Sequence, residues 1–335
     1  MRTRWGDTVF LGVDSGGTKT ALCLVAADGR VAATLRAPSC YYLGTAEGMS
    51  LVGRVLRDAV AQVCAFAGIT PADVSYGFFG LPSYGDIGAD VAGLDAAPRA
   101  ALGHDRYACG NDMVAGWAGS LGVVDGINVV AGTGSICYGE HAGRRARTGG
   151  WGELFGDEGS GYWIALRGLQ AFTQMSDGRL PRGPLADLMR ARLGAAADLD
   201  VLAVTMVRWG GDRSQIAALS PVVVAAAEAG DEQARAILVD AAQHLVALVD
   251  ATRRRLGYEP SEVVPVSHTG GVFSAAPVRD EFVRLLAGTH EGYEFREPQY
   301  PPVVGAALYA ARLAGAPLVP AALVRLREQV AQAPV

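Results

Sequence analysis

The sequence predicts an α/β protein of two domains, each built on a mixed β-sheet. Its 335 residues are too many for one ordinary hydrophobic core. An apolar strand, a glycine turn and a second strand occur near residue 9 and again near residue 127. Long segments with apolar residues at helical spacing accompany both occurrences. This repetition indicates two related domains that face each other.

The first domain is expected to open with antiparallel strands. Residues 9–13 form an apolar run that leads through a glycine turn into a second run, residues 21–25. The dipeptide at 28–29, Asp-Gly, is a two-residue hairpin signal before a third strand at 31–35. Helical spacing of apolar residues then predicts a helix over residues 45–68.

The second domain is expected to repeat this opening and then become helical. Residues 127–131 and 136–140 are predicted strands on either side of a glycine turn. Residues 162–256 are mostly helical by periodicity and alanine content. A further strand at 263–268 enters a third glycine turn, and the tail beyond residue 305 is again helical.

Charge and hydropathy exclude several classes of partner. The net charge is −5, from 29 basic and 34 acidic residues, and no block of Lys or Arg stands out. We therefore expect neither nucleic acid nor an anionic membrane as a partner. The apolar stretches are far shorter than the roughly 20 residues that a membrane span needs. Because the first strand begins near residue 9, we expect no signal peptide and a cytoplasmic location.

The cysteines and histidines give no metal motif. The five cysteines are scattered and contain no C-x-x-C, so we interpret them as reduced thiols in apolar segments. A structural zinc or iron–sulfur site would need close ligand spacing that the sequence lacks. The five histidines are equally dispersed, and none is assigned a metal or catalytic role.

Two glycine-rich turns indicate phosphate chemistry. The first contains Gly16, Gly17, Thr18 and Lys19, directly after a strand that ends at Asp14. The second consists of Gly132, Thr133, Gly134 and Ser135. Backbone N–H groups without side chains in the way can cradle phosphate oxygens. Two such turns with an isolated carboxylate between them favour a cleft that holds a nucleotide from both sides, and we interpret the chain as a phosphotransferase.

Asp14 is the candidate metal ligand. A carboxylate at a strand end, beside a phosphate-binding turn, is well placed to bind hydrated Mg²⁺. The alternative is that Asp14 braces the glycine turn through an Asx hydrogen bond, and the second glycine turn favours the metal role. Thr18 and Lys19 could donate to phosphate oxygens, although Lys19 could equally point into solvent. The spacing is not that of a Walker turn.

Asp112 is the candidate general base. It follows Asn111 after a short predicted strand and precedes a helix-like segment, residues 114–122. A carboxylate in this place could take the proton of a substrate hydroxyl during phosphoryl transfer. The alternative is an N-cap for the helix. Its position upstream of the second glycine turn favours the general base.

The segment 149–163 is the densest in glycine, acidic and aromatic residues. Carboxylates near an aromatic wall and exposed backbone amides suit a polar polyol ligand. The alternative is a loop capped by Asp157 before a helix at 161–172, and both descriptions can hold together. Residues 269–274, with Gly270 and Gly271, could pass under an adenine or ribose because they lack obstructing side chains.

In this order, the motifs resemble the sugar-kinase branch of the actin/hexokinase/Hsp70 ATPase superfamily, and most closely N-acetylglucosamine kinases of the BadF/BadG/BcrA/BcrD ATPase family. The likeness spans nearly the whole chain, and its most specific block is residues 149–164. The resemblance implies two ribonuclease-H-like (actin-like ATPase) domains with mixed sheets around an interdomain cleft. The first would comprise residues 1–115, completed by the C-terminal helix 304–335. The second, residues 116–303, would carry nucleotide and sugar contacts.

The resemblance also implies roles for single residues. Asp14 and Thr18 resemble the first phosphate and Mg²⁺ element, and Thr133 resembles the second. Asp112 resembles the general base that contacts the sugar hydroxyl. The implied sugar contacts are Gly150, Trp151, Gly152 and Asp157. The implied adenosine contacts are Gly270 and Gly271, with Gly230 as a further nucleotide contact. The expected reaction is phosphorylation of N-acetylglucosamine to its 6-phosphate by ATP with Mg²⁺, in a homodimer.

One departure from the family pattern leaves the acceptor open. The family usually carries an Asn that touches the sugar in the loop after the second or third strand. Residues 37–44 contain no Asn here, and Ser39 or Cys40 stands near its place. Loss of a buried polar partner can change substrate discrimination strongly. Glucosamine, N-acetylmuramic acid or another hexose therefore remain alternative acceptors.

Two other functions fit the sequence less well. An ATPase that activates a radical dehydratase needs a cysteine-held cluster shared across a dimer, and no cluster motif is present. A non-enzymatic sensor is disfavoured because Asp112 and all three glycine turns are retained and the sequence offers no DNA-binding extension. The ROK-type kinases and repressors share the first turn, but their Cys-rich zinc motif is missing here.

Overall fold

The computed structural model describes residues 5–6, 8–289 and 292–332, and the chain divides into two compact units. Unit 1 consists of Met1–Val124 and Glu297–Val335, and unit 2 of Asp125–Arg296. The expected boundaries at 115/116 and 303/304 would cut through two helices, α3 (Asp112–Leu121) and α11 (Pro302–Leu313). Both helices belong whole to unit 1, because α11 packs against α3 and against the sheet of that unit.

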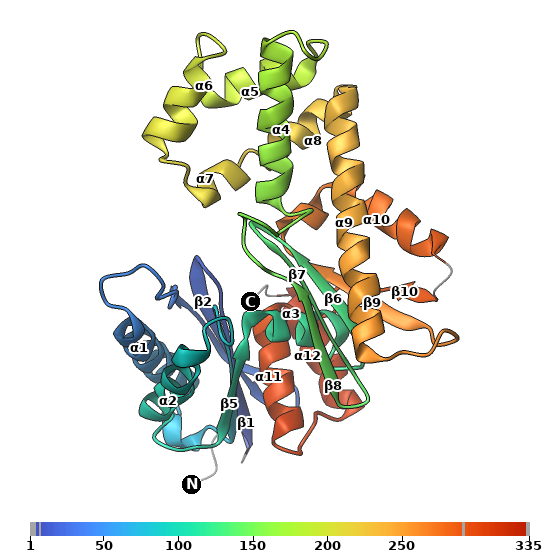
Figure 1. The fold of residues 1–335 in the computed structure, drawn as a ribbon. Helices are drawn as coiled ribbons and strands as arrows, with labels where there is room; N and C mark the ends of the chain where they lie inside the picture. The colour runs from blue at the N-terminus through green and yellow to red at the C-terminus, as the bar shows by residue number, and fades with distance from the viewer. Residues whose placement is uncertain (1–4, 7, 290–291, 333–335) are drawn as a thin grey trace. The chain divides into compact units, whose positions relative to one another are not determined.

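Unit 1 is built on a five-stranded mixed sheet with the order β3-β2-β1-β4-β5; its strands β1, β2 and β5 are labelled in Figure 1. The strands are β1 (Val9–Ser15), β2 (Lys19–Ala26), β3 (Val31–Pro38), β4 (Tyr76–Leu81) and β5 (Tyr107–Asn111). Strand β2 is antiparallel to both of its neighbours, β1 and β3, whereas β4 and β5 run parallel to β1. The predicted strand–turn–strand opening is therefore confirmed, and parallel strands follow it.

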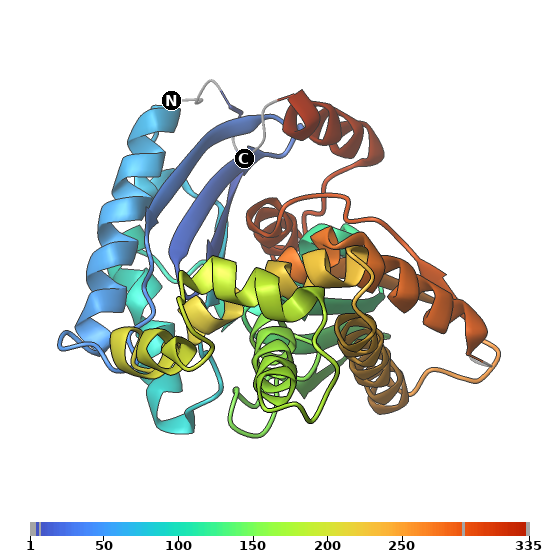
Figure 2. The same ribbon diagram turned by 90° about the horizontal axis from the view of Figure 1, so that it is seen from above.

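Helices cover both faces of this sheet, as Figure 2 shows. The helices of unit 1 are α1 (Met49–Ala67), α2 (Val91–Leu102), α3, α11 and α12 (Pro320–Gln332). Strand β2 contributes to both layers because successive side chains alternate between faces. Leu22 and Leu24 pack into the core that contains α1, whereas Cys23 and Val25 pack with α11 and α12.

Glycines bring α11 unusually close to its neighbours. A Cβ atom at Gly12 of β1 would collide with the backbone of Val303 and Ala307, and one at Gly305 would collide with the backbone of Gly119 in α3. A Cβ atom at Gly119 would lie 2.8 Å from the carbonyl oxygen of Pro301. Since every obstructing atom is backbone, no rotamer change could make room. These glycines therefore fix the C-terminal segment onto the first sheet.

Unit 2 repeats the sheet topology of unit 1. Its strand order is β10-β9-β6-β7-β8, in which β6, β7 and β8 are antiparallel and β9 and β10 run parallel to β6. The strands are β6 (Gly126–Ala131), β7 (Ser135–His141), β8 (Arg144–Gly149), β9 (Val264–Thr269) and β10 (Tyr293–Phe295). Two of these strands have no strand signal in the sequence: β8 is polar, with three arginines, and β10 is only three residues long. The repeat in the sequence thus corresponds to two sheets of identical strand order.

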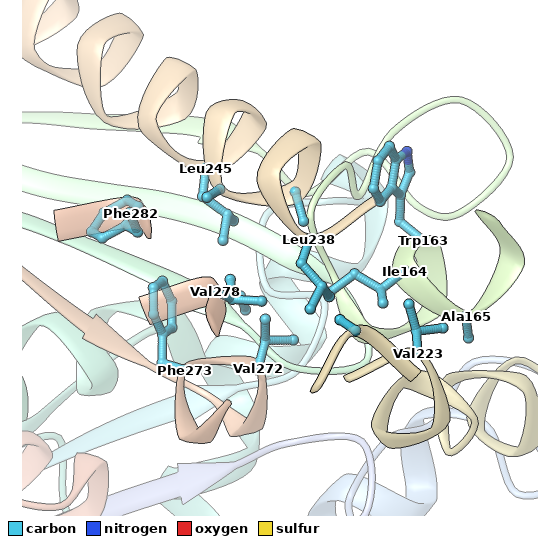
Figure 3. Close-up of a cluster of buried hydrophobic side chains, with 14 of the residues drawn as sticks. Trp163, Ile164, Ala165, Val223, Leu238, Leu245, Val272, Phe273, Val278 and Phe282 are labelled. Carbon is cyan, nitrogen blue, oxygen red and sulfur yellow. The ribbon is translucent and has the colours of Figure 1, made fainter. Parts of the chain in front are cut away.

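The helices of unit 2 are α4 (Gly161–Ser176), α5 (Pro184–Leu193), α6 (Asp200–Leu202), α7 (Arg213–Ala217), α8 (Ser220–Glu228), α9 (Glu232–Leu256) and α10 (Ala276–Gly288). Helices α4 to α9 confirm the predicted helical region 162–256, and α10 lies beyond it. Helix α9 packs along β7 and β8, and α4 packs on α8 and α9. One core joins these elements; Figure 3 shows Ile164, Val223, Leu238, Leu245 and Phe282 within it.

No helix in the described part of the chain is both long and apolar enough to span a bilayer.

Candidate active site

In unit 1, two carboxylates lie at the same edge of the sheet. Asp14 is paired with Gly80 across β1 and β4, and Leu81 is paired with Asn111 across β4 and β5. Because these strands are parallel, Asp14 and Asp112 emerge at their shared carboxyl end. A Cβ atom at Gly16 would lie 3.8 Å from Oδ2 of Asp112. The first glycine turn and the two aspartates therefore form one group, which we call the carboxylate edge.

Asp112 is not the N-cap of its helix. The cap of α3 is Asn111, whose side-chain oxygen accepts a hydrogen bond of 3.2 Å from the N–H of Met113. The alternative interpretation of Asp112 as the cap is therefore wrong, because the preceding residue occupies that position. Asp112 is instead the first residue of the helix. Its carboxylate is not committed to the capping bond.

Burial perturbs the pKa of both carboxylates, and the charge of Asp14 perturbs that of Asp112 further. Burial raises the pKa of Asp14 to about 6, and the nearby Lys19 ammonium lowers it in part. Burial also raises the pKa of Asp112 to about 7, and the charge of Asp14 raises it further. A general base works best when its pKa lies near the operating pH. Asp112 meets that condition in the ligand-free protein.

The raised pKa values predict a pH-dependent stability. In the metal-free and nucleotide-free protein, the folded state disfavours ionised Asp112, so stability is full below the unfolded pKa near 4 and is lost as pH rises toward about 7. We expect Asp112→Asn to be more stable than wild type at pH 8 by roughly 1–3 kcal/mol in free energy of unfolding, and so to unfold at a higher temperature. This difference in stability should vanish near pH 4. Thermal unfolding in EDTA from pH 4 to 8 measures this, and parallel curves for both proteins would contradict it.

The carboxylate edge suits Mg²⁺ rather than a metal held entirely by protein ligands. Among the described residues there is no group of three or more His, Cys, Asp or Glu that could hold an ion. Mg²⁺ is usually bound by one or two carboxylates together with substrate phosphates and water. Asp14, with Asp112 beside it, supplies such a donor set. A cation would also relieve the repulsion between the two carboxylates.

The backbone of the first turn leaves two amides for a ligand. The N–H of Gly16 donates to the carbonyl oxygen of Lys19 at 3.0 Å and is therefore occupied. Gly17 and Thr18 are exposed, and their N–H groups have no acceptor in the described structure. Phosphate binding by this turn would therefore use Gly17 and Thr18, with the exposed Lys19 beside them.

The loop after β3 is attached to the first turn. The hydroxyl of Ser39 donates to the carbonyl oxygen of Gly16 at 2.7 Å and accepts from the N–H of Tyr41 at 3.0 Å. The Cys40 sulfur lies 2.9 Å from Oγ of Ser15, which lies 2.8 Å from Oγ1 of Thr20. Ser39 and Cys40, one of which is expected to stand near the place of the family's Asn, thus lie at the carboxylate edge. Their hydrogen bonds position the turn.

In unit 2, the second turn lies between β6 and β7 and is held by α4. The N–H of Gly161 donates to the carbonyl oxygen of Gly132 at 2.7 Å, and that of Tyr162 to Thr133 at 3.3 Å. The N–H of Gly132 is also occupied, by Gly134 at 2.9 Å. The amides of Thr133 and Gly134 have no acceptor in the described part of the chain. Only these two amides of the predicted set 132–134 are therefore open to a ligand.

The third glycine turn lies beside the second. Strands β6 and β9 are parallel, with Val130 opposite Thr269, so both turns emerge at the same edge of the sheet. Gly270 has a φ of +98°, and a Cβ atom there would collide with the backbone of Ala131 and Gly132. The predicted nucleotide residues Gly270 and Gly271 thus adjoin the second turn within one unit.

Two of the predicted sugar contacts, Gly150 and Asp157, are hydrogen-bonded to Ser135 at the end of the second turn. The N–H of Gly150 donates to the carbonyl oxygen of Ser135 at 2.9 Å, and Trp151 is 72% exposed in the loop that follows. Asp157 is 3% exposed and has a φ of +59°, a backbone conformation that is costly for a residue with a Cβ. It does not cap α4, because Oγ of Ser160 accepts from the N–H of Trp163 at 3.1 Å. That alternative for Asp157 is wrong.

Two further residues bear on this site. Gly230 has a φ of +94° in the exposed turn between α8 and α9, and its N–H donates to Ala227 at 3.1 Å; its nucleotide contact stays a prediction. Arg213 was missed by sequence analysis, and its guanidinium pairs with Asp157. It lies 56 residues from Asp157 in the chain and belongs to no motif, so no sequence pattern pointed to it.

The comparison with protein families decides the assignment. The model of the BadF/BadG/BcrA/BcrD ATPase family matches residues 11–310. The chain belongs to this family. The family resemblance expected from the glycine turns and the Gly-Trp-Gly block is therefore confirmed.

Relatives agree with this membership over most of the chain. A protein of Dictyostelium discoideum named N-acetyl-D-glucosamine kinase is 28% identical over 320 residues, which cover 90% of this chain and 97% of the relative. A protein of Clostridium acetobutylicum named N-acetylmuramic acid/N-acetylglucosamine kinase is 30% identical over 282 residues, 82% of this chain and 89% of the relative.

A solved structure agrees as well. The crystal structure of a candidate N-acetylglucosamine kinase from Chromobacterium violaceum superposes with a TM-score of 0.70 at 26% identity, covering 90% of this chain and 99% of that one. The two mixed sheets of this family member thus have the predicted ribonuclease-H-like, actin-like ATPase fold.

Proposed function

We propose that this family member transfers the terminal phosphoryl group of ATP to a hydroxyl of an amino sugar, most specifically N-acetylglucosamine, forming its 6-phosphate. The carboxylate edge carries the proposal: Asp112 lies beside the Gly16 turn with a pKa raised to about 7 by burial and by Asp14. The two named relatives support kinase chemistry on this class of sugar. With ATP as the donor, we expect the reaction to take place in the cytoplasm.

Each unit contributes its own residues to the reaction. In unit 1, Asp112 contacts the acceptor hydroxyl and takes its proton, while Gly17, Thr18 and Lys19 donate to phosphate oxygens. Asp14 holds Mg²⁺, which neutralises charge on the phosphates when it is bound. These roles depend on positioning and on charge rather than on a covalent intermediate.

In unit 2, the second and third glycine turns bind the nucleotide, and the loop after β8 binds the sugar. Thr133 and Gly134 bind phosphate through their N–H groups. Gly270 and Gly271 leave room for the adenosine. The proposed sugar contacts are Gly150, Trp151, Gly152 and Asp157, among which the exposed Trp151 offers an aromatic face and the buried Asp157 a carboxylate.

A coupled assay of ADP release tests the function. We expect purified protein with ATP and Mg²⁺ to release ADP with N-acetylglucosamine and to discriminate it from N-acetylmuramic acid, glucosamine, N-acetylmannosamine and glucose. Phosphorus NMR of the product identifies the phosphorylated hydroxyl, and light scattering tests the expected homodimer. ADP release that is the same with and without every sugar would contradict the proposed function.

A further inference from the structure

Arg213 joins two carboxylates of the proposed sugar-binding loop. Its guanidinium pairs with Oδ2 of Asp157, and its Nε lies 3.3 Å from Oε2 of Glu153. Glu153 and Asp157 belong to the same loop between β8 and α4, and Arg213 is the first residue of α7. One side chain from a distant element therefore bridges two of the three acidic residues of the loop, Glu153 and Asp157.

The same side chain lies against the second glycine turn. A Cβ atom at Gly134 would collide with the Arg213 guanidinium and would lie 2.7 Å from Oδ2 of Asp157. The other carboxylate oxygen of Asp157, Oδ1, accepts from the N–H of Ser135 at 3.4 Å. The turn, the loop carboxylate and the guanidinium are thus in direct contact within unit 2.

Arg213 is held in this place by its own element. Gly210 and Gly211 have positive φ values of 59° and 75° and turn the chain into α7. The helix begins with Asp212 as its cap, which accepts from the N–H of Gln215 at 2.8 Å. Helix α7 packs on α4, the helix whose N-terminus supports the second turn. The capped start of α7 therefore fixes the backbone of Arg213, and the pairs with Asp157 and Glu153 place its guanidinium.

We propose that Arg213 is a positioning residue for the sugar: it holds Asp157 and Glu153 in the arrangement that binds the acceptor, while contacting no reacting atom itself. This inference rests on the proposed function and adds a residue outside every motif of the sequence. Asp157 needs such support because its backbone conformation is unfavourable and its carboxylate is nearly inaccessible to solvent.

The charge of Arg213 also affects the titration of Asp157. Burial raises the pKa of Asp157, and the Arg213 guanidinium and the Ser135 N–H lower it in part, while Glu153 and Glu158 raise it. Removal of the guanidinium must therefore raise this pKa further. A protonated Asp157 would accept fewer hydrogen bonds from sugar hydroxyls.

Steady-state kinetics of three variants test the inference. Arg213→Met removes the charge, Arg213→Lys keeps it without the two-pronged geometry, and Arg182→Met is the matched control. Arg182 has a similar exposure and pairs with Asp187 and Asp198 on the surface of unit 2. Melting temperatures accompany each set of KM and kcat values, measured from pH 5.5 to 8.5.

We expect Arg213→Met to raise KM for the sugar on the order of 10- to 100-fold, as for loss of a charged hydrogen bond. KM for ATP should stay unchanged, and the sugar defect should deepen as pH falls, because loss of the guanidinium raises the pKa of Asp157 and favours its protonated form more at lower pH. Arg213→Lys should recover part of the affinity, since an ammonium cannot bridge both carboxylates. Arg182→Met should match wild type.

Other results overturn the inference. An unchanged KM for the sugar in Arg213→Met would contradict the role of Arg213 in sugar binding. A defect confined to kcat and to KM for ATP would also contradict it, because Arg213 would then act on the phosphates. If Arg213→Met fails to fold, the Arg213→Lys variant decides, by whether its KM for the sugar rises while its KM for ATP does not. Absence of sugar-dependent turnover in wild type would overturn the proposed function itself. Failure of the Arg213 inference alone would leave wild-type turnover intact, so the two failures can be told apart.

Discussion

Asp112→Asn is expected to lower kcat by about 10²- to 10⁴-fold, the range that general-base catalysis contributes. The amide has nearly the size of the carboxylate but cannot accept the proton of the acceptor hydroxyl. The N-cap of α3 is Asn111, so the substitution leaves the helix start intact. Binding of ATP should persist, because Gly17, Thr18 and Lys19 are unchanged.

Single-turnover measurement of ADP formation, with ATP binding followed by calorimetry, checks this expectation. Asp105→Asn is the matched control. Asp105 precedes β5, the strand that Asp112 follows, and it forms an exposed ion pair with Arg99 at 3.1 Å. Its turnover should equal that of wild type. Retention of most of the turnover in Asp112→Asn would show that another group accepts the proton.

Gly305→Ala is expected to destabilise unit 1 by about 3 kcal/mol or more, at the upper end of overpacking effects. The new methyl group would occupy the place of the Gly119 backbone in α3. Helix α11 would have to move away from α3 and β1, and this would expose the core that Val303 and Leu308 share with β2. The loss should therefore exceed that of an ordinary core substitution.

Chemical denaturation followed by circular dichroism measures the effect, with allowance for two transitions in a chain of two units. Gly53→Ala is the control of opposite sign. Gly53 lies inside α1, and a methyl group added there would have no neighbouring atom within 4 Å. Alanine at this position should therefore stabilise the helix by about 0.5–1 kcal/mol. Equal stability of the two variants would contradict the packing argument.

The candidate site was partly predictable because its residues follow strands. Asp14 comes directly after an apolar run and Asp112 directly after the short strand that ends at Asn111, and parallel pairing brings such strand ends to one edge of a sheet. The glycine turns were visible for the same reason, as interruptions of strand patterns. The helix caps were not predictable from the sequence. Asn111 and Ser160 each lie near an aspartate that could also cap the helix, and local backbone geometry decides which residue does so.

Local sequence patterns suffice to predict the two strand–turn–strand openings, the three glycine turns and the two strand-end aspartates, because these features depend on short-range patterns of apolar and small residues. Tertiary structure alone decided that Arg213 reaches Asp157, that Ser39 is bonded to the Gly16 turn, and that α11 packs on α3 through Gly305. Such contacts join residues far apart in the chain. Their partners are chosen by the packing of whole elements, which no local pattern records.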